Sequence, residues 1–430
     1  MHKPIFIFLF FVQWCSAQQS WTLQQCLDYA QKNSPDIQQS IIAVSKNQRE
    51  INMAKGKLLP SANTGIGHTY SFGSTINPST NSREALNVQY DQFYANASLD
   101  LLNWKNFMTI SLSKMNKESS EYRLKSMQND IKLGLVNLFF QYMKSKSWFE
   151  VLEPQISGMK EQIARTEKEV EIGSRAKSDV YDIKANFGTI QEQWISAKNE
   201  MNVAKLNLLA ALNINKDTVD FVMIDHVSKP LPFLTKENFI DQLVQKNPIY
   251  LETQKNMEIA DQRIKVAKSD VLPTISGTYQ WSTFYSKTLN ASGNISFSDQ
   301  FSQNKNQQLY FGLNIPVFQQ FQVKNNIEIS KLNKLNTHFE NQKKLTELYK
   351  NLNIIAEQYQ NALEKNQLLE DNFENQKLSF ERSEEKYKEG LIDAYSFFVV
   401  RNNWLQASNN LINSNYNLQQ QMELLKIYSE

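Results

Sequence analysis

The chain has 430 residues, enough for two or three ordinary domains, and a formal net charge of +2 with acids and bases interspersed. This balance predicts no polyanion partner and therefore no nucleic acid. Gly and Pro are scarce, with 12 and 10 residues, while Asn, Gln and Lys are abundant, which is typical of solvated helices.

Residues 1–17 have the features of a secretory signal peptide. Lys3 gives a weakly positive start, residues 5–12 form an apolar core, and residues 15–17 fit a small-residue cleavage site. We therefore expect the mature chain to begin near Gln18 and to be exported.

Cys15 leaves a lipoprotein signal as an alternative, although the preceding Gln13 and Trp14 fit that signal poorly. After cleavage only Cys26 remains, which excludes an intrachain disulfide. No later segment has the run of about 18 apolar residues that predicts a membrane-spanning helix.

Two copies of one unit follow each other along the chain. Leu59-Pro60 corresponds to Leu272-Pro273, an offset of about 213 residues that other landmarks share. We therefore expect an internal duplication, with a first repeat at residues 18–214, a linker at 215–234 and a second repeat at 235–430.

Four segments alternate apolar and polar side chains with a period of two. This pattern predicts β-strands at about residues 61–73, 88–102, 274–285 and 307–317. Each is about the length of a tilted transmembrane strand, with one apolar face and one small, polar face. The alternative is half-buried hairpins of a soluble domain, but no second layer is predicted to cover the apolar face.

The number of strands sets a requirement for assembly. The smallest membrane barrels have about eight strands, so four strands do not close one. Open strand edges in hydrocarbon would leave backbone N–H and C=O groups unpaired. We therefore expect several copies of the chain to close a barrel together, and the strands alone do not fix how many.

Long helices follow each pair of strands. Residues 317–389 contain no Gly or Pro and step their apolar positions by three and four, which predicts a rod that packs against another helix. Gly390 is the predicted reversal point of this hairpin. The first repeat predicts a rod over residues 104–172, kinked or loosened at Pro154, and a return helix over 178–212.

Taken in order, these features resemble the outer-membrane efflux protein family, the channels of the TolC type. The matching pieces are the export signal, the duplicated unit and the Leu-Pro pair before each set of strands. The segment Leu313–Phe318 leading into the second rod also fits, as do the hairpin tips at Ile172–Arg175 and Glu389–Ile392. The resemblance covers almost the whole mature chain.

The resemblance implies a mainly α fold with transmembrane β-strands, in which a homotrimer forms a twelve-stranded β-barrel and an α-helical barrel. The β-barrel would lie in outer-membrane lipid and the helical part in the periplasm. The helical tips would dock onto a periplasmic adaptor, a membrane fusion protein, joined to an inner-membrane pump or ABC exporter. The implied function is an exit duct for efflux or type I secretion, which is not an enzyme and uses no cofactor.

The resemblance also implies a pore constriction near the tips, for which the candidates are Asp179, Asp182, Arg175 and Asp393. The family's Asp-x-x-Asp pattern occurs here only after the first tip. The simpler interpretation is that acids favour the first turn of a helix, with Ser178 or Asp179 as its cap. We also consider a pairing of Arg175 with Asp393 that holds the aperture shut; in that case Asp393→Arg raises single-channel conductance.

The candidate adaptor-docking residues are Gly173, Ser174, Gly390, Leu391 and Ile392. The two glycines are explained most simply as turn formers. Exposed apolar side chains at a tip would in addition suit a partner's helical hairpin.

The sequence predicts no metal site, because its four histidines lie far apart, and it contains no Walker loop or nucleophile elbow. The principal rival interpretation is an exported, non-conducting coiled-coil scaffold that is soluble after export. An enzyme acting on envelope polymers lacks an acid/base pair. The sequence does not identify the substrate, the adaptor or the pump.

Overall fold

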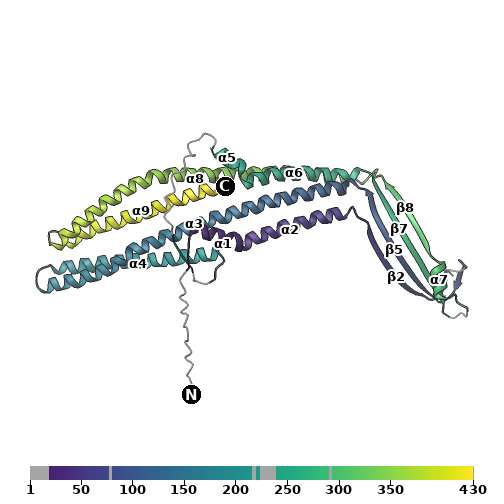
Figure 1. The fold of residues 1–430 in the computed structure, drawn as a ribbon, viewed down its shortest axis with the longest axis horizontal. Helices are drawn as coiled ribbons and strands as arrows, with labels where there is room; N and C mark the ends of the chain where they lie inside the picture. The colour runs from purple at the N-terminus through teal and green to yellow at the C-terminus, as the bar shows by residue number, and fades with distance from the viewer. Residues whose placement is uncertain (1–18, 77–79, 216–218, 223–238, 290–292, 430) are drawn as a thin grey trace, which may run out of the picture. The chain divides into compact units, whose positions relative to one another are not determined.

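A computed structural model describes residues 19–76, 80–215, 219–222, 239–289 and 293–429 (Figure 1). The chain divides into two compact units, each made from segments of both repeats. The tip unit comprises Met1–Ser40, Leu124–Pro248 and Thr346–Glu430, and the sheet unit comprises Ile41–Arg123 and Ile249–Leu345. The predicted signal peptide, residues 1–17, and most of the predicted linker, residues 215–234, lie outside the described residues.

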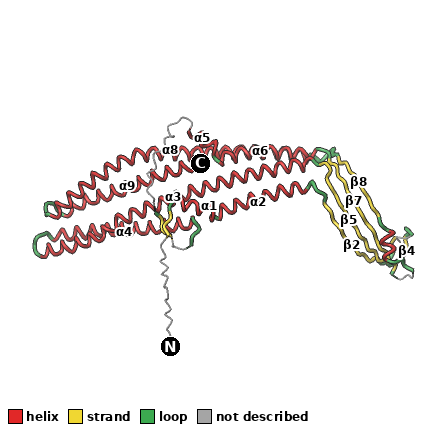
Figure 2. The backbone as a smooth tube through the Cα atoms, in the orientation of Figure 1, coloured by secondary structure: helices red, strands yellow, loops and turns green. Residues whose placement is uncertain are grey.

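The sheet unit contains a four-stranded antiparallel sheet (Figure 2). Its strands, in spatial order, are β2 (Ser61–Ser71), β5 (Val88–Leu102), β7 (Thr274–Thr288) and β8 (Asn306–Asn314). Each repeat supplies two neighbouring strands, and β5 joins β7 at the centre, where Ala95 pairs with Trp281. A separate short pair, β3 (Ser74–Ile76) and β4 (Arg83–Ala85), lies in the connection between β2 and β5.

Helices lead into and out of each pair of strands. They are α2 (Pro35–Gly56), α3 (Trp104–Glu171), α6 (Pro248–Lys268) with the 3-10 turn Ser269–Val271, and α8 (Gln322–Lys388). Within the sheet unit, the buried Glu252 of α6 forms ion pairs with the two neighbouring helices. Its carboxylate lies 3.1 Å from Arg123 of α3 and 3.5 Å from Lys344 of α8. Asn341 of α8 donates to the carbonyl oxygen of Thr253 at 2.8 Å.

The tip unit contains most of the apolar core. It includes α1 (Leu23–Asn33), α4 (Lys177–Ala211), α5 (Phe239–Lys246), α9 (Ala394–Ser429) and the remaining parts of α3 and α8. The parallel strands β1 (Gln19–Trp21) and β6 (Val219–Phe221) pack there, and Phe221 is buried against Phe139 and Tyr142 of α3. A second cluster lies between the two helical hairpins and includes Leu152, Ile190 and Phe397.

The bounds of α3 agree with the predicted first rod to within one residue, and α3 includes Pro154 as one helix. The bounds of the second rod differ from the sequence expectation. The helix α8 begins at Gln322, five residues after the predicted start of the rod, because Gln320 and Phe321 adopt φ values of 51° and 58°. These left-handed conformations interrupt a helix, and neither residue type predicts them.

In the part of the chain that the structure describes, no helix carries an apolar stretch long enough to cross a bilayer.

Candidate functional site

The two helical hairpins reverse through the same backbone motif. Gly173 and Gly390 have φ values of 79° and 76°, which are favourable for glycine only. At the second tip, the Gly390 N–H donates to the Tyr387 carbonyl oxygen and the Leu391 N–H donates to that of Lys386. The first tip repeats both bonds, from Gly173 to Val170 and from Ser174 to Glu169. Both turns are therefore Schellman motifs, which satisfy the last carbonyl groups of α3 and α8.

Each tip exposes one large aliphatic side chain. Ile172 is 78% exposed and Leu391 is 68% exposed. Ile392, which we expected to be exposed, instead packs partly buried against the core cluster between the hairpins. At the second tip, Leu391 is therefore the more exposed of the two side chains.

Arg175 connects the two tips of the tip unit. Its Nε lies 2.8 Å from the Glu169 carboxylate and its Nη1 lies 3.7 Å from that of Asp179. Its Nη2 donates to the Tyr387 carbonyl oxygen at 2.9 Å, and its guanidinium lies 4.4 Å from the centre of the Tyr387 ring. The side chain is only 13% exposed. A guanidinium holds this set of partners because it presents several donors in a fixed plane.

In this chain Arg175 and Asp393 have different partners. Among the described residues, the carboxylates that pair with Arg175 are those of Glu169 and Asp179, whereas the Asp393 carboxylate accepts a 2.7 Å hydrogen bond from the Ser396 N–H at the start of α9. Because that backbone N–H stabilises the charged form, the pKa of Asp393 lies below its ordinary value. Asp393 is therefore a helix cap.

The acids of the first tip are Asp179 and Asp182, and the simpler interpretation expected Ser178 or Asp179 to cap the helix that follows. The N-cap of α4 is Ala176, which makes no side-chain cap bond, so neither Ser178 nor Asp179 caps this helix. Asp179 is partly buried beside Arg175, whereas Asp182 is exposed. Of the four candidate constriction residues, Arg175 and Asp179 form an ion pair in the described part of the chain.

A cavity of about 300 Å³ lies beside Arg175, between α3 and the second hairpin. Its wall includes Gly158, Thr166 and Glu169 of α3, and Tyr387 and Phe397 of the second hairpin. The buried Tyr387 ring stacks on Phe397 with centroids 4.8 Å apart. The contacts of Arg175 with Glu169, Asp179 and Tyr387 are called the tip contact below. Tyr387 therefore joins the tip contact to the core cluster between the hairpins.

Farther from the tips, a buried guanidinium spans the two hairpins. Arg401 of α9 is 4% exposed and its Nη2 donates to the Gln155 side-chain oxygen of α3 at 3.0 Å. Burial lowers the pKa of Arg401 to about 10, although the nearby Glu384 charge acts in the opposite direction. Its burial therefore costs electrostatic free energy that the single bond to Gln155 offsets only in part.

The sheet of the other unit has one apolar and one polar face. Paired residues share a face, so Ile66, Phe93 and Thr283 lie on the same side. Large apolar side chains on that side are exposed: Ile66, Tyr70, Tyr279, Leu309, Phe311 and Leu313 are between 42% and 74% exposed. The opposite side carries mainly small and polar residues, among them Asn63, Asn96, Ser98, Gln280, Ser282 and Gln308.

The two edge strands of this sheet are each paired on one side only. The end strands β2 and β8 each pair with one of the described strands. The edge of β7 beyond its pairing with β8 is different, because Gln300 of the short helix α7 (Phe297–Gln303) bonds the Ser286 backbone there. Phe297 and Phe301 of α7 pack against Phe93 of β5 on the apolar face.

His68 lies on the apolar face and its Nδ1 contacts the Asp91 carboxylate. Among the described residues, no group of three or more His, Cys, Asp or Glu side chains is arranged to hold a metal ion.

Two residues of the tip contact were not among the predicted site residues. Tyr387 falls in the predicted rod of residues 317–389 and Glu169 in that of residues 104–172, and neither was singled out as a site residue. Their positions offer a usable signal, because Glu169 and Tyr387 lie four and three residues before Gly173 and Gly390. A Schellman turn brings this last helical turn next to the tip.

Comparison with known proteins identifies relatives along nearly the whole chain. The family model described as "Outer membrane efflux protein" matches residues 26–213 and 239–427. Outer membrane protein TolC of Escherichia coli is 22% identical over 346 residues, which cover 77% of this chain and 66% of TolC. The chain thus spans slightly less than two thirds of that relative's length.

Solved structures share the fold at low sequence identity. The CmeC outer membrane channel of Campylobacter jejuni superposes with a TM-score of 0.81 at 18% identity, covering 94% of this chain and 85% of CmeC. VceC of Vibrio cholerae gives 0.78 at 13% identity, covering 94% and 95% of the two chains. The MtrE channel of Neisseria gonorrhoeae gives 0.75 at 12% identity, covering 96% and 91%.

Proposed function

This chain belongs to the outer membrane efflux protein family, and from that premise we propose that it is the outer-membrane exit duct of an efflux or type I secretion system. Three copies close a twelve-stranded barrel in the outer membrane, and their helices form a tube in the periplasm. The duct catalyses no reaction. Substrates pass through it from an inner-membrane pump or ABC exporter to the outside.

One observation carries this proposal: an exposed apolar sheet face combined with two open strand edges. Leu309, Phe311 and Leu313 of β8 are each more than 60% exposed, and Ile66 of β2 is 74% exposed. Apolar side chains at this density on one face favour hydrocarbon over water. In hydrocarbon the open edges of β2 and β8 need partners, which neighbouring copies provide by joining β8 of one to β2 of the next.

A matched pair of lysine substitutions tests this orientation. Phe311→Lys places a charge on the apolar face, where it costs about 2–4 kcal/mol near the bilayer centre. Gln308→Lys places the same charge on the polar face, which lines the aqueous duct. We expect Phe311→Lys to reduce the trimer recovered from outer membranes and Gln308→Lys to leave it nearly unchanged. Equal recovery, or a more soluble Phe311→Lys protein, would support the exported scaffold instead.

The tip contact serves as a latch in this function. Arg175 ties the first hairpin to the Tyr387 carbonyl oxygen of the second, so widening the tube at this end breaks that bond. Asp179 and Asp182 near the same tip form the acidic part of the constriction in the trimer. The ring of carboxylates favours cations at the closed aperture.

The exposed tip side chains are the adaptor-docking surface. Ile172 and Leu391 present aliphatic groups on rigid turns whose shape Gly173, Ser174 and Gly390 fix. A periplasmic adaptor with a helical hairpin buries such groups against its own apolar stripe. A photocrosslinking amino acid at position 391 tests this in cells, with position 385 on the exposed surface of α8 as the control. Crosslinks at 391 to an adaptor support docking, whereas crosslinks at 385 alone contradict it.

A further inference from the structure

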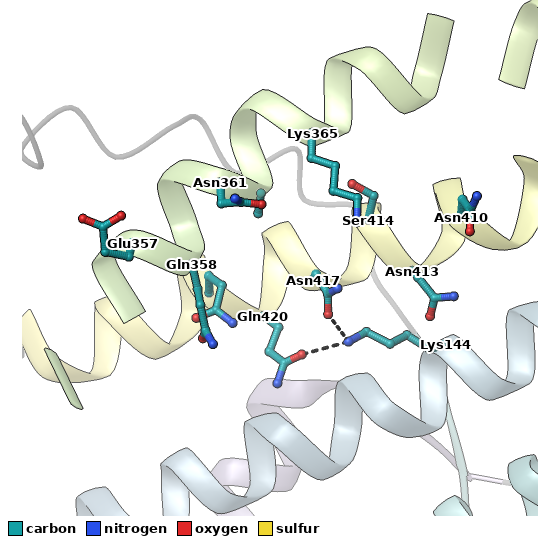
Figure 3. Close-up of a pocket in the computed structure, with 12 residues that line it drawn as sticks. Lys144, Glu357, Gln358, Asn361, Lys365, Asn410, Asn413, Ser414, Asn417 and Gln420 are labelled. Atoms are coloured by element: carbon teal, nitrogen blue, oxygen red, sulfur yellow. Dashed lines mark hydrogen bonds between the residues drawn. The ribbon is translucent and has the colours of Figure 1, made fainter. Parts of the chain in front are cut away.

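A polar groove of about 670 Å³ lies in the tip unit, away from the tip contact (Figure 3). It is lined by α8, α9 and one side chain of α3, Lys144. Seven of its twelve lining side chains are Asn or Gln carboxamides. The others are two lysines, one glutamate, one serine and one alanine. The volume falls within the range of sites for small polar ligands.

The floor of this groove contains polar atoms without a hydrogen-bond partner. Ser414 is 5% exposed and Gln421 is 9% exposed, yet the Ser414 Oγ and the Gln421 Oε1 have no hydrogen-bond partner among the described residues. Both side chains line the groove. Buried polar atoms are normally bonded. Both atoms are shielded from solvent in the groove, so a ligand that donates to them requires the two side chains to turn toward it.

Lys144 does not make the groove an anion site. Its Nζ donates to the side-chain oxygens of Asn417 and of Gln420, the latter at 3.0 Å (Figure 3). These bonds satisfy the ammonium within the chain, and burial lowers the pKa of Lys144. Across the groove, Glu357 and Lys365 carry opposite charges. The lining therefore has little net charge to select a phosphate or a cation.

The chemistry of the lining instead favours a neutral ligand rich in hydroxyl groups. A carboxamide donates through its NH₂ and accepts through its oxygen, which matches a hydroxyl that does both. Apolar ligands and peptide side chains need apolar surface, and Ala362 is the one apolar side chain of the lining. We propose that this groove binds a neutral oligosaccharide, with Ser414 and Gln421 accepting hydrogen bonds from its hydroxyl or acetamido groups.

Saturation-transfer NMR on the full-length assembled protein tests the proposal with two defined probes, chitotriose and maltotriose. We expect saturable binding of at least one sugar. Ser414→Ala and Gln421→Leu each remove one acceptor and should weaken binding about tenfold. Asn403→Ala removes an exposed carboxamide of the same helix outside the groove and should change binding by less than about twofold.

Two further measurements keep the outcome interpretable. If Gln421→Leu fails to assemble, Asn361→Ala replaces it, because Asn361 is an exposed lining residue of α8. Asn413→Cys is labelled with a maleimide in the assembled protein, where the native Cys26 is buried. Reaction at position 413 shows that the groove is open, whereas protection would mean that a neighbouring copy covers it and would overturn the proposal.

The remaining results also decide the proposal. The absence of saturation transfer to either sugar overturns the proposal. Equal binding by wild type, Ser414→Ala and Gln421→Leu also overturns it. Competition by inorganic phosphate or by a neutral Gly-Ser hexapeptide, with loss in the same variants, reassigns the groove to that ligand class. Retention on chitin beads together with chitotriose binding identifies a polymer as the ligand of the groove, and binding of soluble sugar alone identifies a short saccharide.

Discussion

The side chain of Gln300 completes the hydrogen bonding of Ser286 at the edge of β7. The Gln300 Oε1 accepts from the Ser286 N–H at 2.9 Å, and its Nε2 donates to the Ser286 carbonyl oxygen at 2.8 Å. Asn294 makes the same pair of bonds to Thr288 at 3.1 Å. Carboxamides of the β7–β8 connection therefore occupy the place of a strand next to the part of β7 that precedes the start of β8 at Asn306, and they block this edge from other strands.

Gln300→Ala should destabilise the sheet unit. The substitution leaves the backbone groups of Ser286 unpaired, at a cost of about 1–3 kcal/mol. Thermal dissociation of the assembled protein, followed by gel mobility, measures the effect. Gln303→Ala, on an exposed position of the same helix, is the control and should be neutral. Equal melting of both variants would show that the Gln300 bonds contribute nothing.

Arg175→Ala should open the tips. It removes the bond to the Tyr387 carbonyl oxygen and the ion pairs with Glu169 and Asp179, a loss of about 1–3 kcal/mol. The single-channel open probability in planar bilayers should rise about tenfold. Arg175→Lys keeps the charge without the planar fork and should have an intermediate effect.

Two controls separate this latch from a general effect of charge. Arg382→Ala removes an exposed cation of α8 and should leave the open probability unchanged. Asp393→Asn keeps a side-chain oxygen that caps α9 and should also leave it unchanged. A rise with Asp393→Asn equal to that with Arg175→Ala would restore the pairing of these two residues as the latch.

Gly390→Ala should strain the second tip. Its φ of 76° disfavours any side chain although nothing lies within 4 Å of an added Cβ, so we expect a cost of about 1 kcal/mol. Gly188→Ala is the matched control, because Gly188 lies inside α4 with equally open surroundings and no positive φ. Its replacement should stabilise the helix by up to about 1 kcal/mol. Amide hydrogen exchange at the tips distinguishes the two outcomes.

The tip unit should lose stability in acid through Asp220. Burial raises the pKa of Asp220, but hydrogen bonds from Lys146 and Tyr142 outweigh burial and place the pKa below its ordinary value. A depressed carboxyl pKa stabilises the fold above the unfolded pKa of about 3.9, and this contribution is lost as the pH falls through the folded pKa.

Asp220→Asn checks this linkage. At pH 7 the variant should be less stable than wild type by about 1 kcal/mol, and the difference should shrink as the pH falls below about 4. Near-UV circular dichroism of the aromatic cluster around Phe221 follows the transition. A difference that stays constant between pH 7 and pH 3 would exclude Asp220 as the titrating group.

Local patterns predicted much of this fold. The alternation of apolar and polar side chains over residues 88–102 indicated the two faces of β5, and Gly390 marked the second reversal. The partner of Arg175 was not predictable, because Glu169 and Asp393 are both acids near a tip and only the Schellman geometry brings Glu169 within reach. The left-handed backbone conformation of Phe321 and the hydrogen bonds of the Gln300 carboxamide to Ser286 depend on tertiary packing. The local sequence pattern does not encode that packing.

The mass and conductance of the purified, detergent-extracted protein decide whether it is a trimeric duct. We expect a particle of three chains that inserts into planar lipid films and produces discrete conductance steps. A water-soluble single chain that leaves the films electrically silent would contradict this expectation.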